Sequence, residues 1–92
     1  MKLAIFAYSR RGRETALRIR DCLRGPGDEC RCLAPERYAD GTFEVLGSPC
    51  AQATGPLFAW GDALIFVGAA GIAVRSIAPW VRDKRTDPAV LC

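Results

Sequence analysis

The 92-residue chain contains no histidine, and its longest uninterrupted apolar runs are only as long as a strand. The first absence removes the commonest general base and metal ligand. The second excludes a membrane-spanning helix, which needs about 20 apolar residues. Met1-Lys2 leads directly into a strand pattern, so no signal peptide is recognised. We therefore expect a cytoplasmic protein with no membrane partner.

Cysteine is present in an odd number and without the spacing of a metal site. The five cysteines are Cys22, Cys30, Cys32, Cys50 and Cys92. Without histidine, this scattered set favours neither a disulfide framework nor a zinc site. Cys30 and Cys32 alternate along a predicted strand and would share one face, which is typical of reduced, packing cysteines. The sequence therefore predicts no metal site.

The net charge of +3 is small, but its basic residues gather in two clusters. One follows the first predicted strand and the other follows the last predicted helix: Arg10, Arg11 and Arg13; Arg82, Lys84 and Arg85. Such clusters suggest nucleic acid, yet no aromatic platform or nucleic-acid motif accompanies them. We therefore expect no nucleic-acid partner and favour a small polyanion. The oligomeric state is left open, and a homo-oligomer is compatible with the sequence.

Apolar runs and helical patterns alternate along the chain, which predicts one α/β domain over residues 1–92. The predicted strands are Lys2–Tyr8, Glu29–Ala34, Ala63–Val67 and Ala89–Cys92. The predicted helices are Arg13–Leu23, packed by Ala16, Ile19 and Leu23; Pro56–Trp60, with Pro56 first and Gly61 as cap; a helix from Ile72 that Pro79 interrupts; and a short piece, Trp80–Asp83.

This order predicts an open, mostly parallel sheet with helices on both faces, a Rossmann-like or flavodoxin-like three-layer fold. Gly25-Pro26-Gly27 is expected to stop the first helix with a left-handed cap residue. The chain stops inside an apolar strand, which suggests truncation at the C-terminus. We therefore expect the N-terminal fragment of a longer, multi-domain enzyme.

The stretch from Asp62 to Cys92 carries the strongest signal of a binding site. A buried strand ends at Gly68, and Gly71 opens a helix whose N–H groups and positive dipole end favour an anion. We predict that this turn binds substrate through Gly68, Gly71, Ile72 and Arg75, together with Ser9 and Arg10 after the first strand. Alternatively, the glycines serve only helix packing and the arginines only the solvated surface.

The same stretch resembles the N-terminal part of the cobalamin-biosynthesis protein G family, the cobalt-precorrin-5A hydrolases. The resemblance lies in KLAIFAYS, DALIFVGA, the G-x-A-V-R helix start at Gly71–Arg75, Ile77-Ala78-Pro79, and Asp83-Lys84-x-Thr86-Asp87-Pro88-Ala89-Val90. It implies a hydrolase of vitamin B12 synthesis, in the anaerobic pathway, that opens a δ-lactone on a tetrapyrrole-derived corrinoid and releases acetaldehyde. The implied substrate is an anionic corrinoid that carries the cobalt itself, so the protein needs no cofactor.

Catalytic residues cannot be assigned from the sequence. Asp83 and Asp87 are candidate bases and Lys84 a candidate donor, but Asp87 before Pro88 is equally a turn-forming aspartate. No serine lies in a nucleophile-elbow pattern. We expect the isolated fragment to be inactive.

Two other functions remain open. Ser9–Thr15 loosely resembles the phosphate loop of a flavodoxin-like domain that binds flavin mononucleotide. A non-catalytic corrinoid-binding or assembly domain is the other alternative.

Overall fold

A computed structural model describes residues 1–47, 50–68, 70–83 and 85–92 and shows an α/β fold. Within these residues, five parallel strands form one open sheet in the order β3-β2-β1-β4-β5. The strands are β1 (Lys2–Ala7), β2 (Glu29–Pro35), β3 (Glu44–Leu46), β4 (Ala63–Val67) and β5 (Ala89–Leu91). The helices are α1 (Arg10–Leu23), η1 (Glu36–Tyr38), α2 (Cys50–Trp60) and α3 (Ala70–Ile77).

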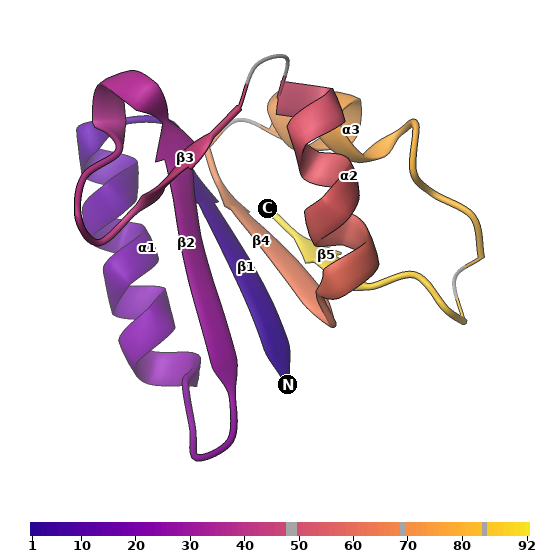
Figure 1. The fold of residues 1–92 in the computed structure, drawn as a ribbon, viewed down its shortest axis with the longest axis horizontal. Coiled ribbons are helices and arrows are strands. Elements are labelled where there is room, and N and C mark those ends of the chain that lie inside the picture. Colours follow the sequence, from indigo (N-terminus) through magenta and orange to yellow (C-terminus); the bar gives the residue numbers. More distant parts are fainter. Residues whose placement is uncertain (48–49, 69, 84) are drawn as a thin grey trace.

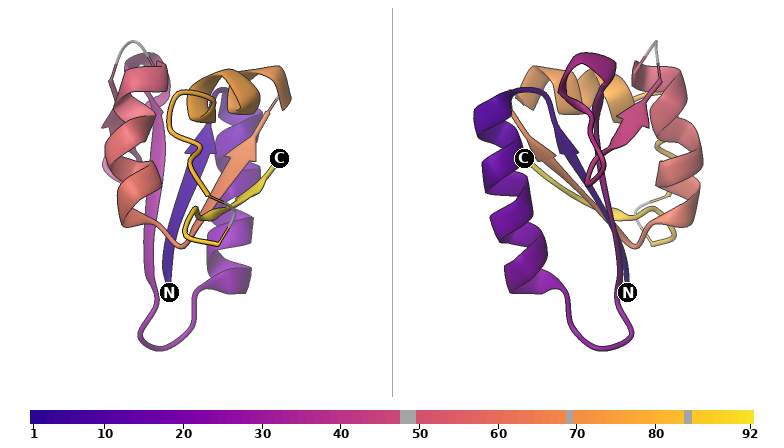
Figure 2. Two further views of the ribbon diagram at one scale, coloured as in Figure 1. Left: turned by 90° about the vertical axis from the view of Figure 1, so that its right-hand side faces the viewer. Right: turned by 60° about the vertical axis from the view of Figure 1, so that its left-hand side comes forward.

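Helices cover both faces of the sheet, as expected. Figure 1 shows α1 on one side, with α2 and α3 on the other, and Figure 2 shows the sheet between them. Central strand β1 separates two cores because its successive side chains point to opposite faces. Ile5 packs with Ala16 of α1, whereas Phe6 packs with Phe58 of α2 and Ala73 of α3. The expected three-layer architecture is therefore confirmed.

The two central strands are buried on both faces. Leu64 and Phe66 of β4 have exposed fractions of 0% and 1%, as the apolar run predicts. Phe66 stacks on Phe6 of β1 with ring centroids 4.5 Å apart. Burying two phenylalanines contributes about 1.5–3 kcal/mol for each side chain, so this pair anchors the α2 and α3 side of the sheet.

Helix α1 begins three residues earlier than predicted, because Ser9 is its N-cap and accepts a hydrogen bond from the Gly12 N–H at 2.9 Å. Ala16 is buried and Ile19 partly buried, but Leu23 is 51% exposed, so its predicted packing role is wrong. The left-handed residue that follows is Gly27, not Gly25.

The region between β2 and β4 differs most from the prediction. The edge strand β3 was not expected, and α2 starts six residues before Pro56 and contains it. Proline lacks an N–H and crowds the preceding turn, so it is disfavoured inside a helix and tolerated at its first position. The sequence therefore predicted Pro56 as the first residue of this helix. Tertiary packing of Thr54 and Leu57, both buried, outweighs that local cost. After α3, a turn at Ala78–Trp80 replaces the second predicted helical piece, Trp80–Asp83.

None of the helices in the described part of the chain is long and apolar enough to cross a membrane.

Candidate functional site at the carboxyl edge of the sheet

The candidate site lies where the chain leaves β1 and β4. These strands are neighbours, with Ala7 opposite Val67 at their carboxyl ends. After β1 the chain enters α1 on one face, and after β4 it enters α3 on the other (Figure 1). This divergence is a topological switch point, where open α/β sheets bind ligands. The strand order changes direction beside β1, since β2 and β3 lie on one side of it and β4 and β5 on the other. Without the short edge strand β3 the order is β2-β1-β4-β5, and the switch point is still beside β1. The site is therefore the same whether the fold is described as Rossmann-like or flavodoxin-like.

Two glycines allow the turns after β1 and β4 to approach each other. A Cβ at Gly12 would lie 3.0 Å from the Ser9 Oγ and 3.4 Å from the Val67 carbonyl oxygen. Gly68 has a φ of 158°, and a Cβ there would lie 3.5 Å from the ring of Tyr8. The role of Gly12 was missed because a glycine in a polar segment looks like an ordinary turn residue.

Gly71 lies in the first turn of α3, one step beyond the sharp turn after β4. It lies inside α3, its φ is not in the left-handed region, and a Cβ there would meet nothing within 4 Å. The sharp turn therefore belongs to Gly68, and the backbone at Gly71 does not require a glycine. What Gly71 provides is an exposed, side-chain-free surface in the first turn of α3.

Arg75 and Ile72 line a cavity of about 390 Å³, here called the Arg75 pocket. Its other lining residues come from the β1 end and from α2 and α3: Tyr8, Ala51 and Ser76. Arg75 lies in the last turn of α3 and is exposed. The pocket thus joins one guanidinium to a mainly apolar wall, which suits a ligand with an apolar body and anionic substituents.

Arg10 lies in a separate cavity of about 480 Å³ on the α1 side of the sheet. The structure therefore brings all six predicted residues to the same edge but does not bring Arg10 and Arg75 into one pocket. Ser9 uses an acceptor position of its hydroxyl to cap α1. Its O–H hydrogen can still donate to a ligand.

The candidate acids hold a loop together. The Asp87 carboxylate accepts hydrogen bonds from the backbone N–H groups of Arg82 and Asp83 at 2.8 and 3.0 Å. Asp83 accepts from the backbone N–H of Arg85 at 2.9 Å, and this bond, followed by the Arg85 side chain, lowers the pKa of Asp83. Both acids therefore serve the turn before β5. Lys84, the candidate donor, lies outside the described residues.

Cys30 and Cys32 face the α1 core, where burial raises the pKa of both thiols, that of Cys32 to about 11. A thiol with a raised pKa is a poor nucleophile. In the described part of the chain, no three histidine, cysteine, aspartate or glutamate side chains form a group that could hold a metal ion.

The Ser9–Thr15 segment, which loosely resembles a flavin phosphate loop, lies at the start of α1. Its residues from Arg10 onward are helical, and the Thr15 hydroxyl donates to the carbonyl oxygen of Arg11 at 3.3 Å. The Thr15 hydroxyl hydrogen is thus engaged within α1, whereas that of Ser9 is not, so the flavodoxin-like alternative loses one of its phosphate donors.

Comparison with known proteins finds a family match for the segment that contains α3, the helix that carries Arg75. The family model described as cobalamin synthesis G N-terminal matches residues 52–92, which include β4, α3 and β5. Residues 52–92 are therefore similar to the N-terminal part of this cobalamin synthesis G family. The chain is also 42% identical over 60 residues to the cobalt-precorrin-5A hydrolase of Salmonella typhimurium. No solved structure matches the chain significantly.

The family model covers only part of the segment for which the sequence predicted a resemblance. The family model begins within α2, so the opening strand and α1 lie before it. The alignment with the Salmonella protein covers 65% of this chain and 17% of that relative. The activity of the whole relative therefore enters only as a proposal.

Proposed function

We propose that the chain acts in cobalamin biosynthesis as the corrinoid-binding part of a cobalt-precorrin-5A hydrolase. In this proposal the whole enzyme opens the macrocycle δ-lactone and releases acetaldehyde. The similarity to the Salmonella hydrolase carries the proposal. The Arg75 pocket, at the switch point of the sheet, supports it independently.

The Arg75 pocket fits the chemistry of a polycarboxylate macrocycle. Ile72 and the ring of Tyr8 provide apolar surface for the edge of the corrin ring, and Arg75 provides a donor pair for one peripheral carboxylate. The open surface at Gly71 lets a flat ligand approach the first turn of α3 without meeting a side chain. Gly68 keeps the preceding turn close to Tyr8.

The residues of the Arg75 pocket favour binding over bond cleavage. Lactone hydrolysis needs a base to activate water, but the described residues that line the pocket include no carboxylate or thiol, and the sequence has no histidine. Asp83 and Asp87 are engaged in their own turn. We therefore assign this chain a substrate-positioning role and leave the hydrolytic residues to the remainder of the enzyme.

Titration of a cobalt corrinoid with free side-chain carboxylates, followed by its visible absorbance, tests this role. Arg75→Gln should weaken binding by roughly ten- to a hundredfold, because a charge-assisted hydrogen bond contributes about 1.5–3 kcal/mol. Arg18→Gln, which removes an exposed arginine of α1, is the control and should leave affinity unchanged.

A corrinoid with esterified carboxylates provides a second control. It should bind wild type weakly, and Arg75→Gln should weaken it no further, because the ionic partner is already absent. Equal affinity of wild type and Arg75→Gln for the free-acid corrinoid would contradict the assignment. Thermal unfolding should be nearly unchanged, because exposed arginines contribute little to folding.

A further inference from the structure

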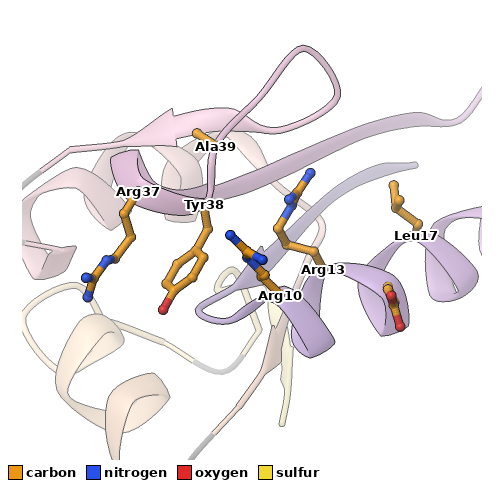
Figure 3. A pocket seen from close by; sticks show the side chains of 7 residues that line it. Arg10, Arg13, Leu17, Arg37, Tyr38 and Ala39 are labelled. Atoms are coloured by element: carbon orange, nitrogen blue, oxygen red, sulfur yellow. The ribbon is translucent and has the colours of Figure 1, made fainter.

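A second cavity, the Arg10 pocket, lies between α1 and the segment that follows β2. Its volume is about 480 Å³. Seven residues line it: Arg10, Arg13, Glu14, Leu17, Arg37, Tyr38 and Ala39. Figure 3 shows the Tyr38 ring between the side chains of Arg37 and Arg10. The two arginines therefore reach the cavity from different elements, η1 and α1.

Arg13 forms a fixed wall of this pocket. It is paired with the Asp40 carboxylate, and its guanidinium carbon lies 5.0 Å from the centroid of the Phe43 ring. Backbone N–H groups of Thr42 and Phe43, and then Arg13, hold the pKa of Asp40 below its usual range. Asp40 thus stays ionised and compensates the Arg13 charge. The Arg13 Nε is buried and has no acceptor among the described residues.

Arg10 and Arg37 keep uncompensated charges. Within the described residues neither forms an ion pair, and the cation–π contact of Arg37 with Tyr38 leaves its guanidinium N–H groups unpaired. Among the described residues, Glu14 is the one acidic residue in the lining. Two guanidinium groups without an ion-pair partner and a tyrosine hydroxyl make a lining that matches an oxyanion.

The charges in the first turn of α1 destabilise the helix. This turn contains no acidic residue and carries Arg10, Arg11 and Arg13 at the positive end of the helix dipole. Cations there repel the dipole and one another, and the fold provides one carboxylate, Asp40, for Arg13 alone. Proteins tolerate such local conflicts chiefly at functional sites. A bound anion would remove the conflict.

We propose that the Arg10 pocket binds a small molecule bearing oxyanionic groups, carboxylate or phosphate, within reach of Arg10 and Arg37 on either side of the Tyr38 ring. This site goes beyond the corrinoid proposal, because it lies on the α1 side of the sheet and the Arg75 pocket lies on the other. Arg10 and Arg37 bind the anion directly, and Tyr38 donates its hydroxyl.

Titration of the 92-residue chain with citrate and, separately, with inorganic phosphate tests the site. Backbone amide NMR shifts are followed at constant ionic strength, with chloride as the reference. Saturable shifts should centre on the start of α1 and on η1. Arg10→Gln and Arg37→Gln should each weaken binding by roughly tenfold or more, and Arg18→Gln, an exposed arginine of α1 outside the pocket, should not.

The two anions separate the sources of the oxyanion. Binding of citrate alone supports a carboxylate ligand, and binding of phosphate alone supports a phosphate ligand. The absence of saturable shifts with both anions overturns the site. Equal weakening by all three variants also overturns it, because binding would then follow net charge. These outcomes leave the corrinoid result unaffected, since Arg75 is intact in every variant.

Thermal unfolding provides a readout that a purely structural role of Arg10 would not reproduce. In chloride, Arg10→Gln should unfold at the same or a slightly higher temperature, because a cation leaves the helix N-terminus. With saturating anion the order should reverse, because wild type gains more from binding. A variant less stable than wild type by the same amount in both solutions would contradict the proposal.

Discussion

Gly55 of α2 should be intolerant of even one added methyl group. An ideal Cβ at Gly55 would lie 2.6, 2.7 and 2.8 Å from three ring atoms of Trp80. Ordinary contacts to a Cβ begin near 3.4 Å, so the ring or the helix would have to move. The ring is held in place, because its Nε1 donates a hydrogen bond to the Ala51 carbonyl oxygen at 2.7 Å. The clash therefore cannot be relieved by a simple rotation.

Two effects of Gly55→Ala oppose each other, and the steric one should dominate. Overpacking a well-filled site costs about 1–3 kcal/mol, whereas replacing a helical glycine by alanine gains up to about 1 kcal/mol. Because the contacts are with the body of an anchored ring, we expect a net loss of about 1–2 kcal/mol. For a domain of this size, each kcal/mol corresponds to about 4–8 °C in Tm.

Urea unfolding monitored by circular dichroism measures this loss, with Gly71→Ala as the matched control. Gly71 is also helical, but a Cβ there meets nothing within 4 Å, so the control should gain up to about 1 kcal/mol. In a Trp80→Ala background the cost of Gly55→Ala should vanish, because the clashing ring is absent. Equal or higher stability of Gly55→Ala in the wild-type background would refute the reasoning.

Three further predictions concern binding, thiol reactivity and pH. Gly71→Ala should stabilise the chain yet weaken the corrinoid in the absorbance titration, and unchanged affinity would remove Gly71 from the site. A thiol reagent at pH 8, followed by peptide mass spectrometry, should modify the exposed Cys22 and Cys92 in the native chain but Cys32 only after unfolding, because burial raises the pKa of Cys32 to about 11. The hydrogen bonds from Arg31, at 2.5 and 2.8 Å, lower the pKa of Glu44 in the folded chain. Stability from this pair should be present above the ordinary glutamate value of 4.5 and lost as pH falls through the lowered value, so Glu44→Gln should show a smaller drop in unfolding free energy between pH 6 and pH 3.

The sequence by itself determined the central strands and the position of the switch point. The runs that form β1 and β4 are apolar at every position from Leu3 to Ala7 and from Ala63 to Val67, which is the pattern of strands covered on both faces. Pro79 marked the end of α3 in the same local way. Such signals need no tertiary context, because they depend on the composition of consecutive residues.

Tertiary structure alone decided the elements whose local signals are weak or contradictory. β3 has three residues and one buried side chain, so no periodicity identifies it. The sequence predicted Pro56 as the first residue of a helix, but α2 begins at Cys50 and contains it. Packing around Thr54 and Gly55 stabilises the helical turns that precede the proline. Leu23 fits an apolar helix face in the sequence, yet in the assembled fold its side chain is 51% exposed.

The separation of the two arginine pockets also required the fold. Along the sequence, Arg10 and Arg75 each follow a buried strand and look equivalent as partners for one anion. The crossovers place α1 and α3 on opposite faces of the sheet, so the two guanidinium groups serve different cavities. Which face a helix takes depends on the strand order and on right-handed crossovers, which are properties of the assembled sheet and not of either segment.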